Sequence, residues 1–217
     1  MTFSIIARDP ASAAFGVAVS TAVPCVGAVV PWAKAGVGAI ATQSRTNVEL
    51  GRDGIKQFEL GLSPRAALEG LLAADPGASV RQVAGIDASG RTFAYTGADC
   101  VAWCGSREGV DYSVQGNMLV GQATIDAMAD AFESNAGRSL HQRLMLALEA
   151  GQAAGGDSRG RVSAALLVTP ADAVTGPPSA TFEPRRYEMS IRVDEHLDPV
   201  AELRRIFDLV RRMGREQ

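Results

Sequence analysis

The amino-acid sequence predicts an α+β protein in which antiparallel sheets are covered by helices. Segments with strand character follow one another in pairs, as in β-hairpins, instead of alternating one by one with helices. Segments with apolar residues at helical spacing form two pairs and a closing helix. Of the 217 residues, 47% are hydrophobic and only 6% aromatic, so we expect one domain, residues 1–217, with a core of small aliphatic side chains.

Each element is predicted from its own local signals. A first hairpin joins strands at residues 2–8 and 15–20 through a turn at Asp9-Pro10. Ser63 and Pro64 are typical of an N-cap and of the first residue of a helix. A second hairpin is expected at 80–87 and 91–96, further strands at 26–30, 36–43, 112–120, 163–168 and 187–193, and helices at 47–60, 65–73, 121–133, 140–150 and 199–213.

The composition narrows the function classes. The chain carries 21 basic and 24 acidic residues, a net charge of −3, which argues against a nucleic-acid partner. No apolar run approaches the roughly 18 residues that a membrane-spanning helix needs. The first residues lack the basic and then apolar pattern of a signal peptide. We therefore expect a cytoplasmic protein that has no membrane partner.

The sequence contains no pattern typical of a metal or cofactor site. Cys25 stands alone, and the pair Cys100 and Cys104 lacks the second pair of ligands that a zinc site requires. His141 and His196 are the only histidines. No dinucleotide-binding or phosphate-binding glycine motif is present. We expect neither a metal nor a cofactor.

The loop at residues 153–163 is the strongest candidate for a functional segment. It holds three glycines and two serines together with Asp157, Arg159 and Arg161. Glycine lets another group approach the backbone closely, and a carboxylate between two guanidiniums can keep a fixed, ion-paired geometry. The loop is either part of a site or a tight turn held by a structural salt bridge between Asp157 and Arg159.

Six segments of the chain, in matching order, resemble the DUF1028 family, a bacterial and archaeal family of unknown function. They are residues 2–10, 27–33, 35–43, 115–117, 154–161 and 192–199. The family is grouped with the N-terminal-nucleophile (Ntn) hydrolases. The resemblance therefore implies a four-layer αββα sandwich, in which two packed antiparallel sheets have helices on their outer faces. Val162 and Lys34 depart from the family pattern at two positions.

The same resemblance implies a catalytic residue at the start of the chain. In Ntn hydrolases the first residue of the mature chain attacks an amide, and its own α-amine serves as the base, because the pKa of that amine lies near neutrality. Thr2 would be this nucleophile once Met1 is removed, and Lys34 would lower the pKa of its hydroxyl. The alternative is that Thr2 only begins a strand and that Lys34 is a surface lysine.

Other polar residues complete the predicted site. Asn117 and Gln115, with the backbone around Gly116, would form an oxyanion hole. Asp157 would orient the α-amine or help to hold an acidic substrate. We expect catalytic roles for Thr2, Lys34, Asn117 and Asp157, and substrate binding by Gln43, Gln115, Arg159, Arg161 and Ser163.

Three functions remain open at this stage. The first is an amidohydrolase that cleaves the C–N amide bond of a small molecule or peptide. The second is a protein without catalytic activity that binds a small anion through Asp157, Arg159 and Arg161. The third is a structural protein whose glycine- and alanine-rich strands and the segment 169–184 build an oligomer. We expect a homo-oligomer in any of these cases.

Overall fold

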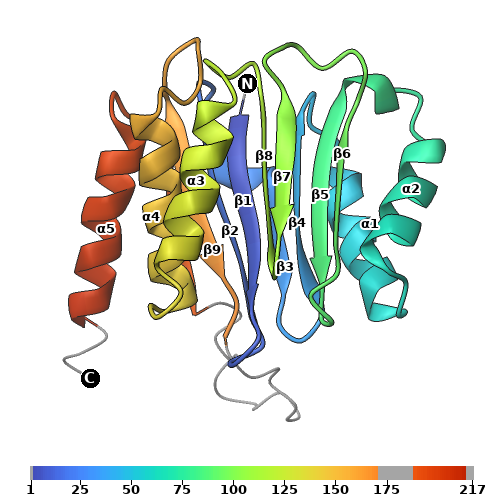
Figure 1. Cartoon of the computed structure of the whole chain (residues 1–217), viewed down its shortest axis with the longest axis horizontal. Coiled ribbons are helices and arrows are strands. Elements are labelled where there is room, and N and C mark those ends of the chain that lie inside the picture. Colours follow the sequence, from blue (N-terminus) through green and yellow to red (C-terminus); the bar gives the residue numbers. More distant parts are fainter. Residues whose placement is uncertain (1, 171–187, 214–217) are drawn as a thin grey trace.

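The computed structural model describes residues 2–170 and 188–213, which form two antiparallel sheets and five α-helices (Figure 1). One sheet has six strands in the order β10-β9-β2-β1-β8-β7, and the other has four in the order β3-β4-β5-β6. The strands are β1 (Thr2–Asp9), β2 (Ala14–Thr21), β3 (Pro31–Lys34), β4 (Gly38–Ser44), β5 (Arg81–Asp87), β6 (Thr92–Thr96), β7 (Gly105–Gly109), β8 (Tyr112–Asn117), β9 (Ser163–Val168) and β10 (Met189–Val193). The helices are α1 (Val48–Glu59), α2 (Pro64–Ala73), α3 (Ala123–Ser134), α4 (Leu140–Ala153) and α5 (Pro199–Met213).

Strand β1 lies inside the six-stranded sheet, and its two faces have different neighbours. Because side chains alternate along a strand, Phe3 and Ile5 point toward the core that the sheet shares with α3, α4 and α5. Ile6 points the other way, into an aliphatic core between the two sheets that also contains Phe15 and Ile86. A strand that is buried on both faces gives the first residues of the chain a fixed position.

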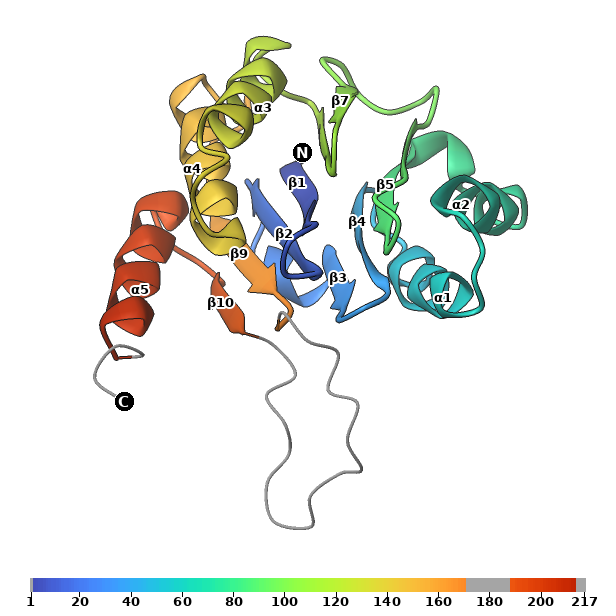
Figure 2. The same cartoon turned by 60° about the horizontal axis from the view of Figure 1, so that its bottom comes forward.

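The helices divide between the outer faces of the two sheets. Helices α1 and α2 pack on the four-stranded sheet through a core that includes Ile40, Phe58 and Leu68. Helices α3, α4 and α5 lie on the opposite side of the molecule, against the six-stranded sheet (Figure 2). None of the described helices is long and apolar enough to cross a membrane.

Local sequence signals fix most of the helix ends. The Asn47 side chain accepts a hydrogen bond from the backbone N–H of Glu49, and the Ser63 side chain caps α2 in the same way. Helix α5 spans the predicted residues 199–213. The first hairpin and the hairpin of β5 and β6 are also confirmed.

Two predicted strands need correction, and two strands of the structure were missed. The segment 26–30 is not a strand but begins with a short 3₁₀ helix (Val26–Ala28), because Cys25 turns the chain with φ 62°. Strands β3 and β7 were not predicted, since neither shows a clear alternation of apolar residues. The strand expected at 112–120 ends at Asn117, because Met118 has φ 53°. Two further predictions fall partly outside the described residues. They concern residue 187 of the strand expected at 187–193, and most of the segment 169–184.

Candidate functional site

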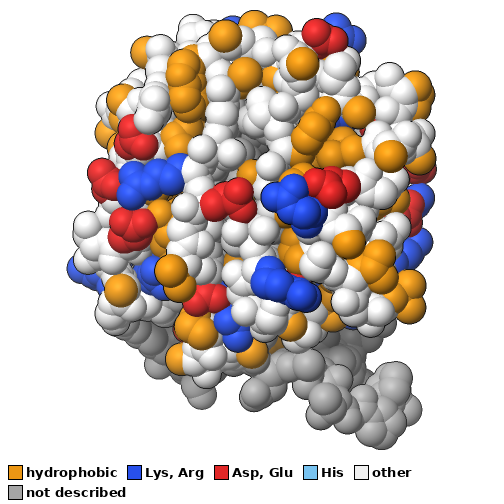
Figure 3. Space-filling view, turned by 45° about the vertical axis from the view of Figure 1, so that its right-hand side comes forward, with side chains coloured by type: hydrophobic (Ala, Val, Ile, Leu, Met, Phe, Trp, Pro, Cys, Tyr) orange, Lys and Arg blue, Asp and Glu red, His pale blue; other side chains and the backbone are white. Residues whose placement is uncertain are grey.

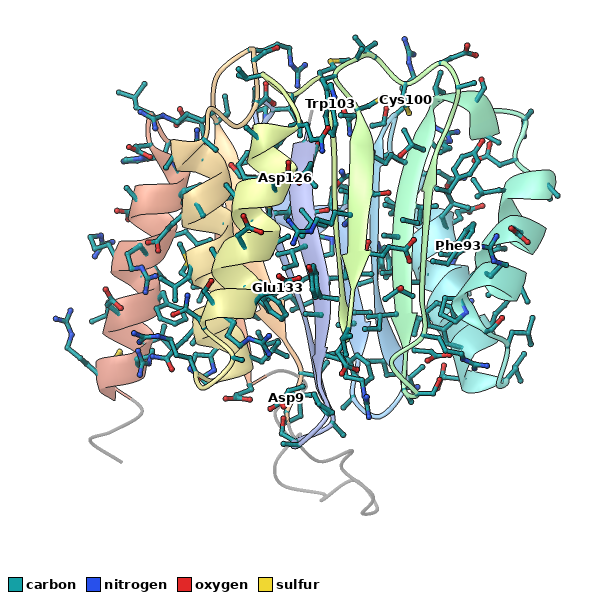
Figure 4. The ribbon with its side chains drawn as sticks, viewed as in Figure 1. Asp9, Phe93, Cys100, Trp103, Asp126 and Glu133 are labelled. Atoms are coloured by element: carbon teal, nitrogen blue, oxygen red, sulfur yellow. The ribbon has the colours of Figure 1, made fainter. Side chains whose placement is uncertain are left out.

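A cavity of about 250 Å³ opens where β1 begins, at the end of the sheets marked N in Figure 1. Figure 4 shows Cys100 and Trp103 at this same end and Asp9 at the other. The cavity walls come from the loop that follows β2, from the ends of β4 and β8, and from the loops around residues 99 and 159. Its lining residues are Thr2, Val23, Val26, Val29, Val30, Ser44, Arg45, Thr46, Val80, Asp99, Val101, Met118 and Arg159.

Thr2 lies in this cavity as the first residue of β1. It is only 5% exposed, and its Oγ1 lies 3.2 Å from Oγ1 of Thr21 on the neighbouring strand. In the sheet, Thr2 faces Thr21 on one side and Asn117 on the other. A hydrogen bond between the two hydroxyls restricts the rotation of the Thr2 side chain.

Left-handed backbone turns shape the cavity. Ser44 and Met118 both line it, and they have φ angles of 69° and 53°. Cys25, in the loop that carries the valines of the wall, has φ 62°. Residues other than glycine adopt such angles at a cost, and they cluster at functional sites. Ala13 and Asp111, in hairpin turns at the other end of the six-stranded sheet, also have positive φ angles, so these angles support the candidate site only together with the cavity.

Ser163 holds the loop that forms one wall. Its Oγ donates to the carbonyl of Val23 at 2.6 Å and accepts from the N–H of Val26 at 3.1 Å. Ser163 is completely buried and does not line the cavity. In this structure Ser163 positions Val23 and Val26, and the substrate contact expected of it stays a prediction.

Asp157 connects the glycine-rich loop to the strand that carries Thr21. Its side chain is 1% exposed, and its carboxylate accepts the N–H of Ala22 and the N–H of Arg159, each at 2.9 Å. The guanidinium of Arg159 lies 3.5 Å from the same carboxylate. Asp157 thus fixes the residue next to Thr21 and, at the same time, places Arg159 at the cavity.

The two arginines of this loop have different surroundings. Their side chains are nearly equally exposed, 43% for Arg159 and 44% for Arg161. Arg159 lines the cavity, whereas Arg161 lies 3.5 Å from the carboxylate of Asp198 and is not among the lining residues. Only one of the two predicted arginines belongs to the candidate site.

A network of buried side chains lies between the sheets, directly beside Thr2. Ser4 donates to Gln43 at 2.7 Å and accepts from Gln115 at 2.6 Å. Gln82 Oε1 accepts from Gln43 at 2.8 Å and from Asn117 at 2.9 Å. All five side chains have 0% exposure. The network binds the two sheets to each other through hydrogen bonds that water does not reach.

This network changes the interpretation of three predicted site residues. The amide N–H groups of Gln43, Gln115 and Asn117 donate inside the protein, and none of these residues lines the cavity. These amides therefore bind one another instead of facing the cavity, and the oxyanion hole and substrate contacts expected of them stay predictions. Asn117 Oδ1 is buried without a hydrogen-bond partner within the described part of the chain, next to Thr2 in the sheet.

Lys34 lies away from Thr2. It is the last residue of β3, pairs with Gly38 at the start of β4, and forms an ion pair with Glu59 of α1. The cavity lies beyond Ser44, at the opposite end of β4. The structure therefore does not bring Lys34 to the hydroxyl whose pKa it was expected to lower.

Sequence reasoning missed the residues that follow β4 and the loop before β7. Arg45 and Thr46 come directly after the strand, and Asp99 and Val101 lie in the loop. Arg81 donates to the carbonyl of Arg45 at 2.6 Å. The usable signal was the position of Arg45 directly after the end of β4, which lies at the same cavity as the start of β1.

An ion pair between Arg81 and Asp75 supports the part of the cavity wall that contains Arg45. Arg81 binds Asp75 at 2.9 Å, and this hydrogen bond lowers the pKa of the Asp75 carboxyl to about 2. Burial raises the pKa of the Cys104 thiol above its ordinary value. Among residues 2–170 and 188–213, no three His, Cys, Asp or Glu side chains are grouped to hold a metal ion.

Comparisons with known proteins agree with this picture of the fold. A family model described as a family of unknown function, DUF1028, matches residues 2–203, so the chain belongs to the DUF1028 family. The crystal structure of protein SPO2555 from Silicibacter pomeroyi, of the same family, is similar with a TM-score of 0.82 and 29% identity. The similarity covers 95% of this chain and 88% of that chain. No curated protein matches the sequence.

Proposed function

We propose that this protein is an amidohydrolase of the N-terminal-nucleophile class, with Thr2 as the nucleophile of the mature chain. In this proposal the two sheets and their outer helices are the four-layer αββα sandwich of that class. The helix packing on each outer face supports it, since α1 and α2 cover one sheet and α3, α4 and α5 cover the other.

The observation that carries the proposal is the position of the Thr2 hydroxyl. Thr2 begins a strand that is buried on both faces, it lines a cavity, and its Oγ1 lies 3.2 Å from a second hydroxyl. A nucleophile needs a fixed orientation and a space in front of it for the substrate. Removal of Met1 would leave the α-amine of Thr2 beside this hydroxyl, where it can serve as the base.

The proposed reaction proceeds in two steps. In the first, Thr2 Oγ1 attacks the amide carbonyl, its proton passes to the α-amine, and the α-ammonium then protonates the leaving nitrogen as the C–N bond breaks. This leaves an ester between the acyl group and Thr2. In the second step a water molecule attacks the ester, its proton passes through the α-amine to Thr2 Oγ1, and the carboxylic acid leaves.

Neighbouring residues would position Thr2 and do not themselves react. Thr21 orients the Thr2 hydroxyl, and Asp157 holds Ala22 beside it. Asn117 offers a buried acceptor, Oδ1, opposite Thr2 in the sheet. In the mature chain this oxygen would accept a hydrogen bond from the α-amine or from the water that relays its proton. A buried acceptor without a partner costs about 1–3 kcal/mol, so filling it would stabilise the reactive arrangement.

The test begins with purified protein whose loss of Met1 is verified by intact mass. An electrophile that traps N-terminal threonines should add once to this protein and not to Thr2→Ala. In a panel of small amides, Thr2→Ala should reduce turnover by about 10³-fold or more, whereas Thr2→Ser should retain much of it. Thr92→Ala, which removes a hydroxyl at the opposite end of the four-stranded sheet, is the matched control. Full turnover by Thr2→Ala would refute the proposal.

A further inference from the structure

The walls of the cavity are mostly aliphatic. Four valines of the loop after β2 line it, together with Val80, Val101 and Met118. Three of the valines remain substantially exposed, with exposures of 45% for Val23, 36% for Val29 and 54% for Val101. Exposed apolar side chains gathered at one cavity mark a place where an apolar ligand group can be buried.

Two arginines line the same cavity. Arg45 and Arg159 lie there beside the carboxylate of Asp99, and the buried carboxylate of Asp157 lies 3.5 Å from the guanidinium of Arg159. The face of the molecule in Figure 3 carries basic and acidic side chains interspersed with hydrophobic ones. Guanidinium groups bind carboxylates through paired hydrogen bonds, so Arg45 and Arg159 offer donors to an anionic group of a ligand.

The size of the cavity limits the ligand. At about 250 Å³ it lies just below the range of roughly 300–1,000 Å³ that is usual for drug-sized ligands. A folded polypeptide cannot enter such a space, whereas a small molecule with a short aliphatic chain can. Thr2 and Thr46 are the lining threonines, and Thr2 carries the hydroxyl that the proposed reaction uses.

We propose that the substrate is a small amide that carries both a carboxylate and a short aliphatic group. This inference rests on the proposed function, because it places the amide carbonyl at Thr2. The aliphatic group packs against Val23, Val29 and Val101, and the carboxylate pairs with Arg159 or Arg45. Hydrolysis then releases one carboxylic acid and one amine, with the anionic group on either product.

The experiment uses two matched pairs of probes, in each of which a primary amide replaces the carboxylate. The first pair is N-butanoylglycine and N-butanoylglycinamide, in which the charge lies on the amine side. The second is N-butylsuccinamic acid and N-butylsuccinamide, in which it lies on the acyl side. We expect the anionic member of at least one pair to have a kcat/KM about tenfold higher or more, as a charged hydrogen bond provides.

Substitution of the arginines then assigns the charge preference to this cavity. Arg159→Gln and Arg45→Gln should reduce the preference to less than about threefold by lowering turnover of the anionic probe alone. Arg161→Gln is the matched control, since it removes an equally exposed arginine of the same loop that pairs with Asp198. Equal turnover of both members of each pair, or an unchanged preference in both variants, would overturn the inference and leave the proposed function standing.

A binding measurement separates the two proposals when no probe is hydrolysed. Calorimetry would compare N-butanoylglycine with N-butanoylglycinamide, and N-butylsuccinamic acid with N-butylsuccinamide, on the mature wild-type protein and on Arg159→Gln. Tighter binding of the anionic member of either pair, lost in Arg159→Gln, would support the ligand class while the hydrolase proposal fails. Equal or undetectable binding in both pairs would overturn the ligand class as well.

Discussion

The space between the two sheets is divided into two parts that are equally buried but chemically different. Away from the cavity it contains aliphatic and aromatic side chains, among them Ile6, Phe15 and Ile86. Beside Thr2 it contains the amide and hydroxyl groups of Ser4, Gln43, Gln82, Gln115 and Asn117. The same strands supply both parts, since β1 contributes Ile6 to one and Ser4 to the other.

The difference shows how a rigid site is built at the edge of a core. Aliphatic packing stabilises the sheets through the apolar area it buries, but it is tolerant of small shifts. Hydrogen bonds between fully buried amides require defined distances and angles, and each unmade bond is costly. The polar part therefore fixes the register of β1, β4, β5 and β8 at the end where Thr2 meets the cavity.

The largest effect is expected in the aliphatic part. Phe15→Ala removes a side chain with 0% exposure and should lower the free energy of unfolding by about 3–5 kcal/mol. Chemical denaturation of the purified variant measures this loss. A loss below about 1 kcal/mol would mean that this part of the core can repack.

A smaller loss of stability is expected in the polar part, with a larger effect on the site. Gln82→Leu leaves donors of Gln43 and Asn117 and the carbonyl of Gly116 without their partner, and should cost about 2–3 kcal/mol. In the proposed enzyme it should also slow trapping of Thr2 by the electrophile. Unchanged stability together with unchanged trapping would show that the network does not position Thr2.

Acid should weaken the wall that carries Arg45. The folded pKa of Asp75 is about 2, below its ordinary value of 3.8, so its contribution to stability is fully present at higher pH. This contribution is lost as the pH falls from about 4 to about 2. Unfolding followed over this range should show a decline that is smaller in Asp75→Asn. The same decline in the variant would assign it to other carboxylates.

The smallest effect is expected for Lys34. Its ion pair with Glu59 is solvent-exposed, so Lys34→Ala should change stability by less than about 1 kcal/mol. Turnover of any amide that the wild type hydrolyses should be unchanged. A large loss of turnover would restore the catalytic role that the family resemblance implied for Lys34.

Local signals in the sequence determined most of the secondary structure. Ser63 and Asn47 mark helix starts because their side chains cap free N–H groups, and the turn at Asp9-Pro10 separates two strands of alternating polarity. The same signals left β3 and β7 unpredicted, since these short strands at sheet edges bury few apolar side chains. The local pattern therefore predicted those helices and strands that are stabilised by the capping, turn and apolar residues of their own segments.

The members of the candidate site were decided by the tertiary structure. The glycine-rich loop, which is visible locally, pointed to Asp157 and Arg159, whereas Thr2 was suggested by the resemblance to the DUF1028 family. The sequence could not separate Arg159 from Arg161, two residues apart, because only the fold places one at the cavity and the other at Asp198. Gln43 and Gln115 likewise read as polar site residues, yet the packing of one sheet on the other satisfies them internally. A polar side chain can face a ligand or bind another side chain inside the protein. Contacts between strands that are distant in the sequence decide between the two, and the spacing of residues in the sequence does not reveal these contacts.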